Sequence, residues 1–340
     1  MDNIMIAIGG ANCGTSPVMP YIGTRFDGKD FTRIVKLYLE TALLRCDFDA
    51  LDIAQSVDDI GDMAMQVNRH TADGAVLISL EAFGSRKSFN DFGGSVVKYC
   101  SRRGGRSKIF CEDICSFLSL AVKSDTEDGG AAWQAVGCPT ATVDVGYITN
   151  FDDLKRALDP DFQVNAAEHI AMGICEHFGM PYVKRDDILS YPLLCSSATG
   201  KRGKKIKMLQ ALLGANGYMT EIDGIYGKHT DDAVKQAAIN NGMSETDGVN
   251  AALWRDLLLL NKQHVEFGSK CTTALYIQRK LFAKLYKTPM DGCLGEQTLC
   301  ALNEYLKDIE SGITVSRSSG VSSDVIKLLS PVGGGRPRLF

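Results

Sequence analysis

Short apolar runs alternate with amphipathic segments through the first half of the chain. The runs at residues 4–8, 75–80, 96–99 and 140–145 have the length and composition of buried strands. Residues 30–45, 109–122 and 164–178 place their apolar side chains at the helical period. Strands that alternate with helices in this way predict an α/β domain over residues 1–183, in which helices flank a largely parallel sheet.

The second half contains an internal duplication. Gln210 and Gln278 are separated by 68 residues, and the same offset relates seven further pairs of identical residues without a gap. The seven pairs are Leu213 and Leu281, Tyr218 and Tyr286, Asp223 and Asp291, Gly224 and Gly292, Gly227 and Gly295, Thr230 and Thr298, and Ala233 and Ala301.

Each copy predicts the same small helical module. An apolar helix face precedes a loop that reads DGIYGKHT in the first copy and DGCLGEQT in the second. The Asp-Gly step suits a tight turn, and Thr230 or Thr298 stands where an N-cap would begin the next helix. We therefore expect two three-helix all-α modules, at residues 204–262 and 263–310, after a linker at 184–203. The Ser-, Gly- and Pro-rich residues 311–340 predict an extended tail, within which residues 324–332 have the pattern of one short docking helix.

Charge and hydropathy narrow the range of partners. The 340 residues carry a formal net charge of −4, which gives no basic footprint for a nucleic acid. No apolar stretch approaches the roughly 18 residues that a membrane span needs. Asp2 precedes a short apolar run with neither a basic segment nor a small-residue cleavage site, so we expect synthesis in the cytoplasm without a signal peptide. The 11 cysteines include no CxxC pair and are interpreted as buried thiols, the alternative being disulfides formed after release.

The duplicated segment resembles the small three-helix peptidoglycan-binding module found on many cell-wall hydrolases. The first copy carries the resemblance in IKMLQALLGANGYMTEIDGIYGKHTDDAVKQAAINNG and in the later Trp254, and the second copy keeps the DGxxGxxT core. The resemblance implies that bacterial peptidoglycan is the partner, bound through stem peptide or glycan in a shallow groove near the loop. Tyr218, Tyr226 and Tyr286 are then the candidate ligand-binding residues.

The first half resembles the zinc-dependent N-acetylmuramoyl-L-alanine amidases over about residues 4–180. The segments IAIGGANCG, AVLISLEAFG, CPTATVDVGYITNFDDLKRAL and AAEHIAMGICEHFG occur in that family's order. In that family His, Glu and His hold the zinc ion, and a second Glu polarises the attacking water. The resemblance implies an amidase-like fold with its metal site at the ends of these strands.

The positions that match the family's metal site carry other residues here. Asn12 and Glu81 stand in place of the two histidines, and Asp144 replaces the catalytic glutamate. The glutamate ligand falls in the segment FDGKD, where Asp27, Gly28 and Asp30 are the choices and Asp27 is taken as the ligand. Zinc favours nitrogen and sulfur ligands, whereas an all-oxygen set suits a hard cation such as magnesium or calcium. We interpret Asn12, Asp27 and Glu81 as a degenerate metal site without zinc, and Asp144 and Glu81 as the remaining catalytic positions.

These observations favour a peptidoglycan-engaging protein whose amidase-like domain is inactive. The lack of an export signal makes a bacteriophage tail, baseplate or lysis component an attractive hypothesis, with the C-terminal tail contacting other virion proteins. Two alternatives stay open: an active metal-dependent amidase of the endolysin type with an unusual metal set, and a structural virion assembly protein.

Overall fold

The computed structural model describes residues 4–11, 14–53, 60–100, 105–118, 135–194, 199–244 and 248–330. The chain folds into two compact units. The first unit comprises Met1–Val18, Arg25–Ala157 and Gln163–Lys184, and the second comprises Met19–Thr24, Leu158–Phe162 and Arg185–Phe340. Within the described residues, no helix is both long and apolar enough to cross a membrane.

The first unit is built on a five-stranded sheet with the order β2-β1-β3-β5-β4. Its strands are β1 (Met5–Gly10), β2 (Asp49–Asp52), β3 (Gly74–Glu81), β4 (Val96–Lys98) and β5 (Thr140–Tyr147). β2, β1, β3 and β5 are parallel, and only β4 pairs antiparallel, with β5. The prediction of an α/β domain with a largely parallel sheet is confirmed, although the short polar strand β2 was not predicted.

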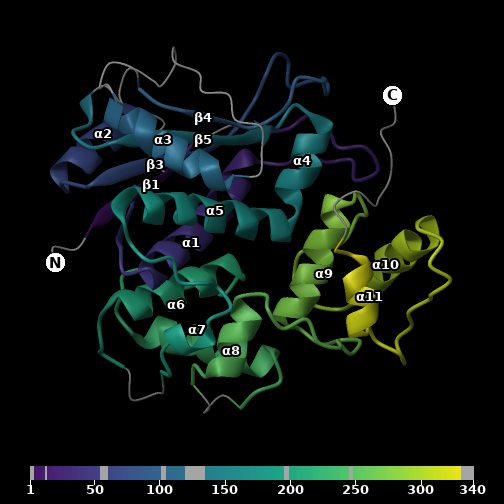
Figure 1. The fold of residues 1–340 in the computed structure, drawn as a ribbon. Coiled ribbons are helices and arrows are strands. Elements are labelled where there is room, and N and C mark those ends of the chain that lie inside the picture. The colour runs from purple at the N-terminus through teal and green to yellow at the C-terminus, as the bar shows by residue number, and fades with distance from the viewer. Residues whose placement is uncertain are drawn as a thin grey trace. The chain divides into compact units, whose positions relative to one another are not determined.

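In the part of the chain that the structure describes, five α-helices accompany this sheet (Figure 1). They are α1 (Gly28–Arg45), α2 (Ile60–Arg69), α3 (Gly105–Phe117), α4 (Phe151–Leu158) and α5 (Pro160–Phe178). The predicted helices at 30–45, 109–122 and 164–178 correspond to α1, α3 and α5, and residues 119–122 lie outside the described part of the chain. α1 lies against β1, β2 and β3, while α3 lies against β4 and β5.

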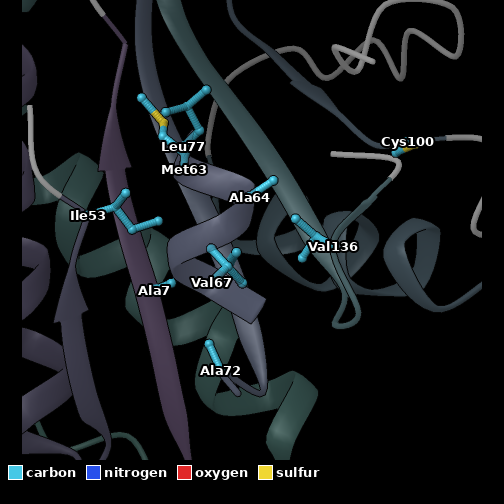
Figure 2. Close-up of a cluster of buried hydrophobic side chains, with 10 residues drawn as sticks. Ala7, Ile53, Met63, Ala64, Val67, Ala72, Leu77, Cys100 and Val136 are labelled. Carbon is cyan, nitrogen blue, oxygen red and sulfur yellow. The ribbon is translucent and has the colours of Figure 1, made fainter. Parts of the chain in front are cut away.

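One face of the sheet carries both a packed core and the candidate polar site. Met63, Ala64 and Val67 of α2 belong to one buried apolar cluster with Ala7 of β1 and Leu77 of β3, in which Met63 lies beside Leu77 (Figure 2). Side chains alternate between the two faces of a strand, so Ser79, two positions after Leu77 in β3, stands on this same face. On this face the side chains of β3 therefore change from apolar at Leu77 to polar at Ser79.

The second unit contains the two helical modules that the duplication predicts (Figure 1). The first module has α6 (Lys204–Ala215), α7 (Lys228–Asn240) and α8 (Ala251–Leu257), and the second has α9 (Thr272–Ala283), α10 (Glu296–Asp308) and α11 (Ser323–Leu328). The buried Trp254 of α8 donates a hydrogen bond from its indole nitrogen to the Pro192 carbonyl oxygen, 2.7 Å away.

The repeated loop owes its shape to one glutamine in each copy. The Gln210 side-chain nitrogen donates to an Asp223 carboxylate oxygen at 2.9 Å and to the Thr230 hydroxyl at 3.0 Å, while its side-chain oxygen accepts from the Gly224 backbone at 2.8 Å. Gln278 makes the equivalent bonds in the second copy, at 2.7, 3.1 and 2.8 Å. The duplication thus preserves a buried polar network as well as an apolar core.

This network corrects the predicted N-caps. The helices begin one turn earlier than expected, after the caps Gly227 and Gly295, so Thr230 and Thr298 lie inside the first turn of α7 and α10. Both hydroxyls are buried, and each is bonded to the glutamine of its own copy. The identical threonines reflect this buried contact and not a capping role.

The duplication also extends beyond the predicted module boundaries. Leu194 pairs with Val249 ahead of α8, and Val265 pairs with Val321 ahead of α11, each as an isolated antiparallel bridge. Residues 311–330, assigned from sequence to the extended tail, therefore supply the third helix of the second module. The expected short helix is α11, and its Ile326 is 1% exposed. Residues 331–340 lie outside the described chain.

Candidate functional site

A lysine ammonium joins two carboxylates at one side of the sheet in the first unit. The Lys98 Nζ atom lies 2.8 Å from a carboxylate oxygen of Glu81 and 2.8 Å from one of Asp144. The Asp144 side chain is fully buried, that of Lys98 is 14% exposed, and that of Glu81 is 35% exposed. The ion pair of Lys98 and Asp144 is therefore buried, while the Glu81 carboxylate is partly open to solvent.

Strand register brings these three side chains together. Asp144 of β5 is paired with Ser79 of β3, and Lys98 of β4 is paired with Thr142 of β5. Paired residues share a face of the sheet, so Lys98 and Asp144 stand on the same side of neighbouring strands. A register irregularity between Ser79 and Glu81 then lets the end of β3 approach the same ammonium.

The ion pair leaves Asp144 with an unusual proton affinity. Burial is the largest influence, and with the nearby Glu81 charge it raises the pKa of Asp144 to about 7, while the Lys98 ammonium opposes the rise. Burial alone would lower the pKa of Lys98, but its bonds to Asp144 and Glu81 outweigh this and raise it. Lys98 therefore stays charged at neutral pH, whereas Asp144 is poised to exchange a proton.

The residues matched to the family's metal site do not form a metal centre among the described residues. No group of three or more His, Cys, Asp or Glu side chains that could hold a metal ion occurs in that part of the chain. The Asp27 carboxylate is the N-cap of α1 and accepts from the Lys29 backbone nitrogen at 3.0 Å. Asn12 lies outside the described residues. The donors present beside Glu81 do not suit zinc, because the neighbouring group is a cation.

An exposed aromatic stack lies next to this site in the sequence and in the fold. Phe83, two residues after Glu81, is 50% exposed and stacks on Phe92, which is 47% exposed, with ring centroids 4.0 Å apart. Tyr147, at the end of β5, meets Phe92 edge to face at 4.9 Å. Sequence analysis missed this stack and Lys98. The single lysine in the apolar VVKYC run was the available signal for Lys98.

Hydrogen bonds in the turn after β5 connect this strand, which carries Asp144, to the residues just before β4. The Asn150 side-chain oxygen accepts from the backbone nitrogens of Asp152 and Asp153 at 3.0 Å and so caps α4. The Asp153 carboxylate in turn accepts from the backbone nitrogens of Gly94 and Tyr147, at 2.8 and 3.0 Å. These bonds fix β4 relative to β5 and hold Lys98 in reach of Asp144.

The three candidate ligand-binding tyrosines of the repeat lie in different environments. Tyr226 and Tyr286 are fully buried, and the Tyr286 hydroxyl donates to an Asp308 carboxylate at 2.7 Å. Their rings serve packing, which corrects the expectation of ligand contact for these two. Tyr218 is partly exposed and lines a small cavity between the modules, together with Asn240. Only Tyr218 retains access to a ligand.

Comparison with known proteins finds a family match in the second half of the chain and similar solved structures over about half of the chain. The family described as "Putative peptidoglycan binding domain" matches residues 202–255. No curated protein matches the chain.

Solved structures of amidases are similar to about half of the chain. N-acetylmuramoyl-L-alanine amidase AmiC2 of Nostoc punctiforme is 18% identical, covers 52% of this chain and 97% of its own, and has a TM-score of 0.44. The catalytic domain of CwlV, an N-acetylmuramoyl-L-alanine amidase from Bacillus (Paenibacillus) polymyxa var. colistinus, is 20% identical, with 52% and 99% coverage and a TM-score of 0.43. The N-acetylmuramoyl-L-alanine amidase from Clostridium difficile 630 is 19% identical, with 53% and 98% coverage and a TM-score of 0.44.

Proposed function

We propose that this protein binds peptidoglycan through its duplicated helical modules. The observation that carries the proposal is the loop network, repeated atom for atom around Gln210 and Gln278, in a segment whose first copy matches a peptidoglycan-binding family. Two linked modules that each engage the wall would raise retention by effective concentration, without new contacts.

We further propose that the first unit holds no zinc and acts as a non-catalytic part of the protein. The Lys98 ammonium already forms ion pairs with Glu81 and Asp144, each 2.8 Å away, in the place where the amidase resemblance puts a metal ion. A divalent cation there would have to displace a charged lysine whose pKa is raised by the same two carboxylates. The two carboxylates therefore support the Lys98 ammonium as the cation of this site.

Sedimentation with purified sacculi tests the binding proposal. We expect the whole chain to sediment with sacculi and to stay in solution without them. A chain that stays in solution with sacculi would contradict wall binding and would favour the structural assembly protein. Folding of the sample is checked by circular dichroism in both arms.

A second candidate function is hydrolysis of the wall, favoured by the pKa of Asp144 near 7. A carboxyl group with such a pKa can act as a general acid or base at neutral pH. Muropeptide analysis after incubation with zinc or magnesium decides between the two. New muramic acid and stem-peptide ends that disappear in Asp144→Asn would establish hydrolysis and overturn the non-catalytic proposal. An unchanged muropeptide pattern in every metal supports it.

A further inference from the structure

The junction of the two modules encloses a cleft of about 660 Å³. One wall is the end of α7, including Asn240 and Asn241, together with Asp256 of α8. The other wall is the connecting segment that runs from Asn261 to the start of α9. Neither module contains the cleft by itself, because each contributes only one wall.

A buried carboxylate without a cation faces this cleft. Asp256 is 6% exposed, and one of its carboxylate oxygens accepts a hydrogen bond from the Asn261 amide at 2.7 Å. Among the described residues Asp256 forms no ion pair, although Lys270 also lines the cleft, and burial raises the pKa of Asp256 to about 6 against the effect of Asn261. Isolating such a charge from water is costly unless a cation pairs with it.

The fold of the repeat does not require a carboxylate at this position. The caps Asn250 and Ser322 begin α8 and α11 in the same way, each side chain accepting from the backbone nitrogen three residues later. Counting from these caps places Asp256 of the first module opposite Leu328 of the second. The second copy forms the same helix with an apolar residue at this position. The fold of the helix therefore does not explain the carboxylate of Asp256, whereas its place in the lining of the cleft can.

The remaining lining is rich in groups that pair with amides. Asn240, Asn241, Asn261 and Gln263 each bring a carboxamide to the cleft. The Asn241 oxygen already accepts from the Thr272 backbone and hydroxyl, and the Asn261 nitrogen donates to Asp256. The carboxamide atoms outside these bonds, above all those of Gln263, can donate to or accept from a ligand. A volume of about 660 Å³ falls within the usual range for sites that enclose a small ligand. These features suit a short peptide and offer its backbone several partners.

We propose that the inter-module cleft binds a short peptide that carries a free primary ammonium group, with the ammonium paired to Asp256. This inference rests on the proposed function, because an uncrosslinked stem peptide of peptidoglycan with a diamino acid has this chemistry. Asp256 itself is only 6% exposed, so an ion pair with its carboxylate is stronger than one between two groups at the surface. The carboxamides then orient the peptide backbone.

Calorimetric titration of the whole chain tests the proposal with a defined probe. The probe is the tetrapeptide L-Ala-γ-D-Glu-L-Lys-D-Ala with a free ε-amine, and the comparison is the same peptide acetylated at that amine. We expect the free-amine peptide to bind, and both acetylation and Asp256→Asn to weaken binding at least tenfold. Asp232→Asn, an exposed aspartate on α7 outside the cleft, is the matched control and should bind as the unmodified chain does.

The outcomes distinguish this inference from wall binding in general. Equal affinity for the two peptides, unchanged binding by Asp256→Asn, or no binding of the free-amine peptide would each overturn the cleft proposal. If the unmodified chain still sediments with sacculi in those cases, only the cleft inference fails. Thermal unfolding of Asp256→Asn verifies that any loss of binding comes from the missing charge and not from a lost fold.

Discussion

Lys98 shows how one side chain changes the chemistry of a whole site. Its ammonium binds the two carboxylates that otherwise would repel each other across β3 and β5, and its own side chain is only 14% exposed. A fixed ammonium cannot polarise a water molecule by direct coordination as a metal ion does, and it has no vacant ligand position. The same residue therefore stabilises the strand ends, and its charge opposes the binding of a divalent cation there.

Replacing Lys98 by Met should destabilise the first unit. The substitution leaves the fully buried Asp144 without its counter-charge, and we expect a loss of about 2 kcal/mol, limited by protonation of Asp144. Urea unfolding followed by circular dichroism measures the change. Lys108→Met is the matched control, because the Lys108 side chain is 54% exposed and its ion pair with Glu112 is long, at 3.7 Å. This substitution should change stability by less than about 0.5 kcal/mol. Equal effects of the two substitutions would contradict the ion-pair argument.

Asp256→Asn should stabilise the protein at neutral pH while it weakens peptide binding. The folded-state pKa of Asp256 is raised to about 6 from an ordinary 3.8, so the folded chain holds this proton more tightly than the unfolded chain. The ionised carboxylate therefore costs stability above pH 6, and that cost disappears as the pH falls from 6 towards 4. We expect a gain of about 2 kcal/mol at pH 7.5 that vanishes near pH 4.

Thermal unfolding across this pH range measures the difference between the two chains. The other titratable groups that line the cleft are His264, Glu266, Lys270 and Cys271, and they are the same in both chains. Their contribution therefore cancels in the comparison. A variant that is less stable at pH 7.5 would show that Asp256 supports the fold.

Single residues were predictable from sequence only where local patterns reveal them. Glu81 and Asp144 follow or belong to clear apolar strands, so their meeting at one side of a parallel sheet is expected. Lys98 was missed because its partners depend on β4 pairing antiparallel with β5, which no local pattern encodes. Asp27 is the N-cap of α1, a role that an aspartate before a helix fills without a metal, and its assignment as a metal ligand stays a prediction.

At the scale of elements, the two modules are completed by short segments that carry little sequence signal. In the second module the Asn303 side chain exchanges two hydrogen bonds with the Val315 backbone, at 2.8 and 2.9 Å. The Tyr305 hydroxyl donates to the Leu328 carbonyl oxygen at 2.6 Å. The segment between α10 and α11 is therefore held to the module at Val315 and, through the bridge to Val265, at Val321.

Truncation after residue 311 should unfold the second module. It removes α11 and leaves the half-buried Asn303 and the buried Tyr305 without their partners. Hydrogen exchange of α9 and α10 measures this, and we expect their protection to be lost. A chain that ends at residue 330 is the control and should keep full protection. Intact protection in the shorter chain would mean that the module ends before α11.

The extent of the modules was only partly visible in the sequence. The loop is specified by identical residues such as Gln210 and Gln278, because their buried bonds tolerate no other side chain of that shape. α8 and α11 need only an N-cap and an apolar face, which many residues provide, so Trp254 and Ile326 occupy equivalent positions without identity. The two copies share a pattern of caps and apolar positions there and not identical residues. For this reason the sequence did not reveal that the second module extends to α11.

At the scale of the whole molecule, the two units carry separate chemistry. The ion pair of Lys98 belongs to the first unit, and the duplicated loops and the cleft belong to the second. The proposed wall binding depends only on the second unit. The proposed loss of zinc depends only on the first.

Glu81→Gln should therefore leave retention on sacculi unchanged. The substitution is isosteric, and Glu81 is 35% exposed, so the fold should tolerate it. Sedimentation of the whole chain with sacculi measures the bound fraction, and we expect it to equal that of the unmodified chain within about 10%. Asp256→Asn in the same assay should reduce it. A loss of retention in Glu81→Gln would place wall contacts in the first unit.

The position of the cleft has a consequence for how such proteins diversify. A site built between two neighbours is inherited by neither of them, so transfer of a single module to another protein carries the loop network but leaves this cleft behind. In a row of modules the number of such junctions is always one fewer than the number of copies. Gene duplication created this junction by joining two copies in one chain, and the copies now differ at the matching position, with Asp256 in the first and Leu328 in the second.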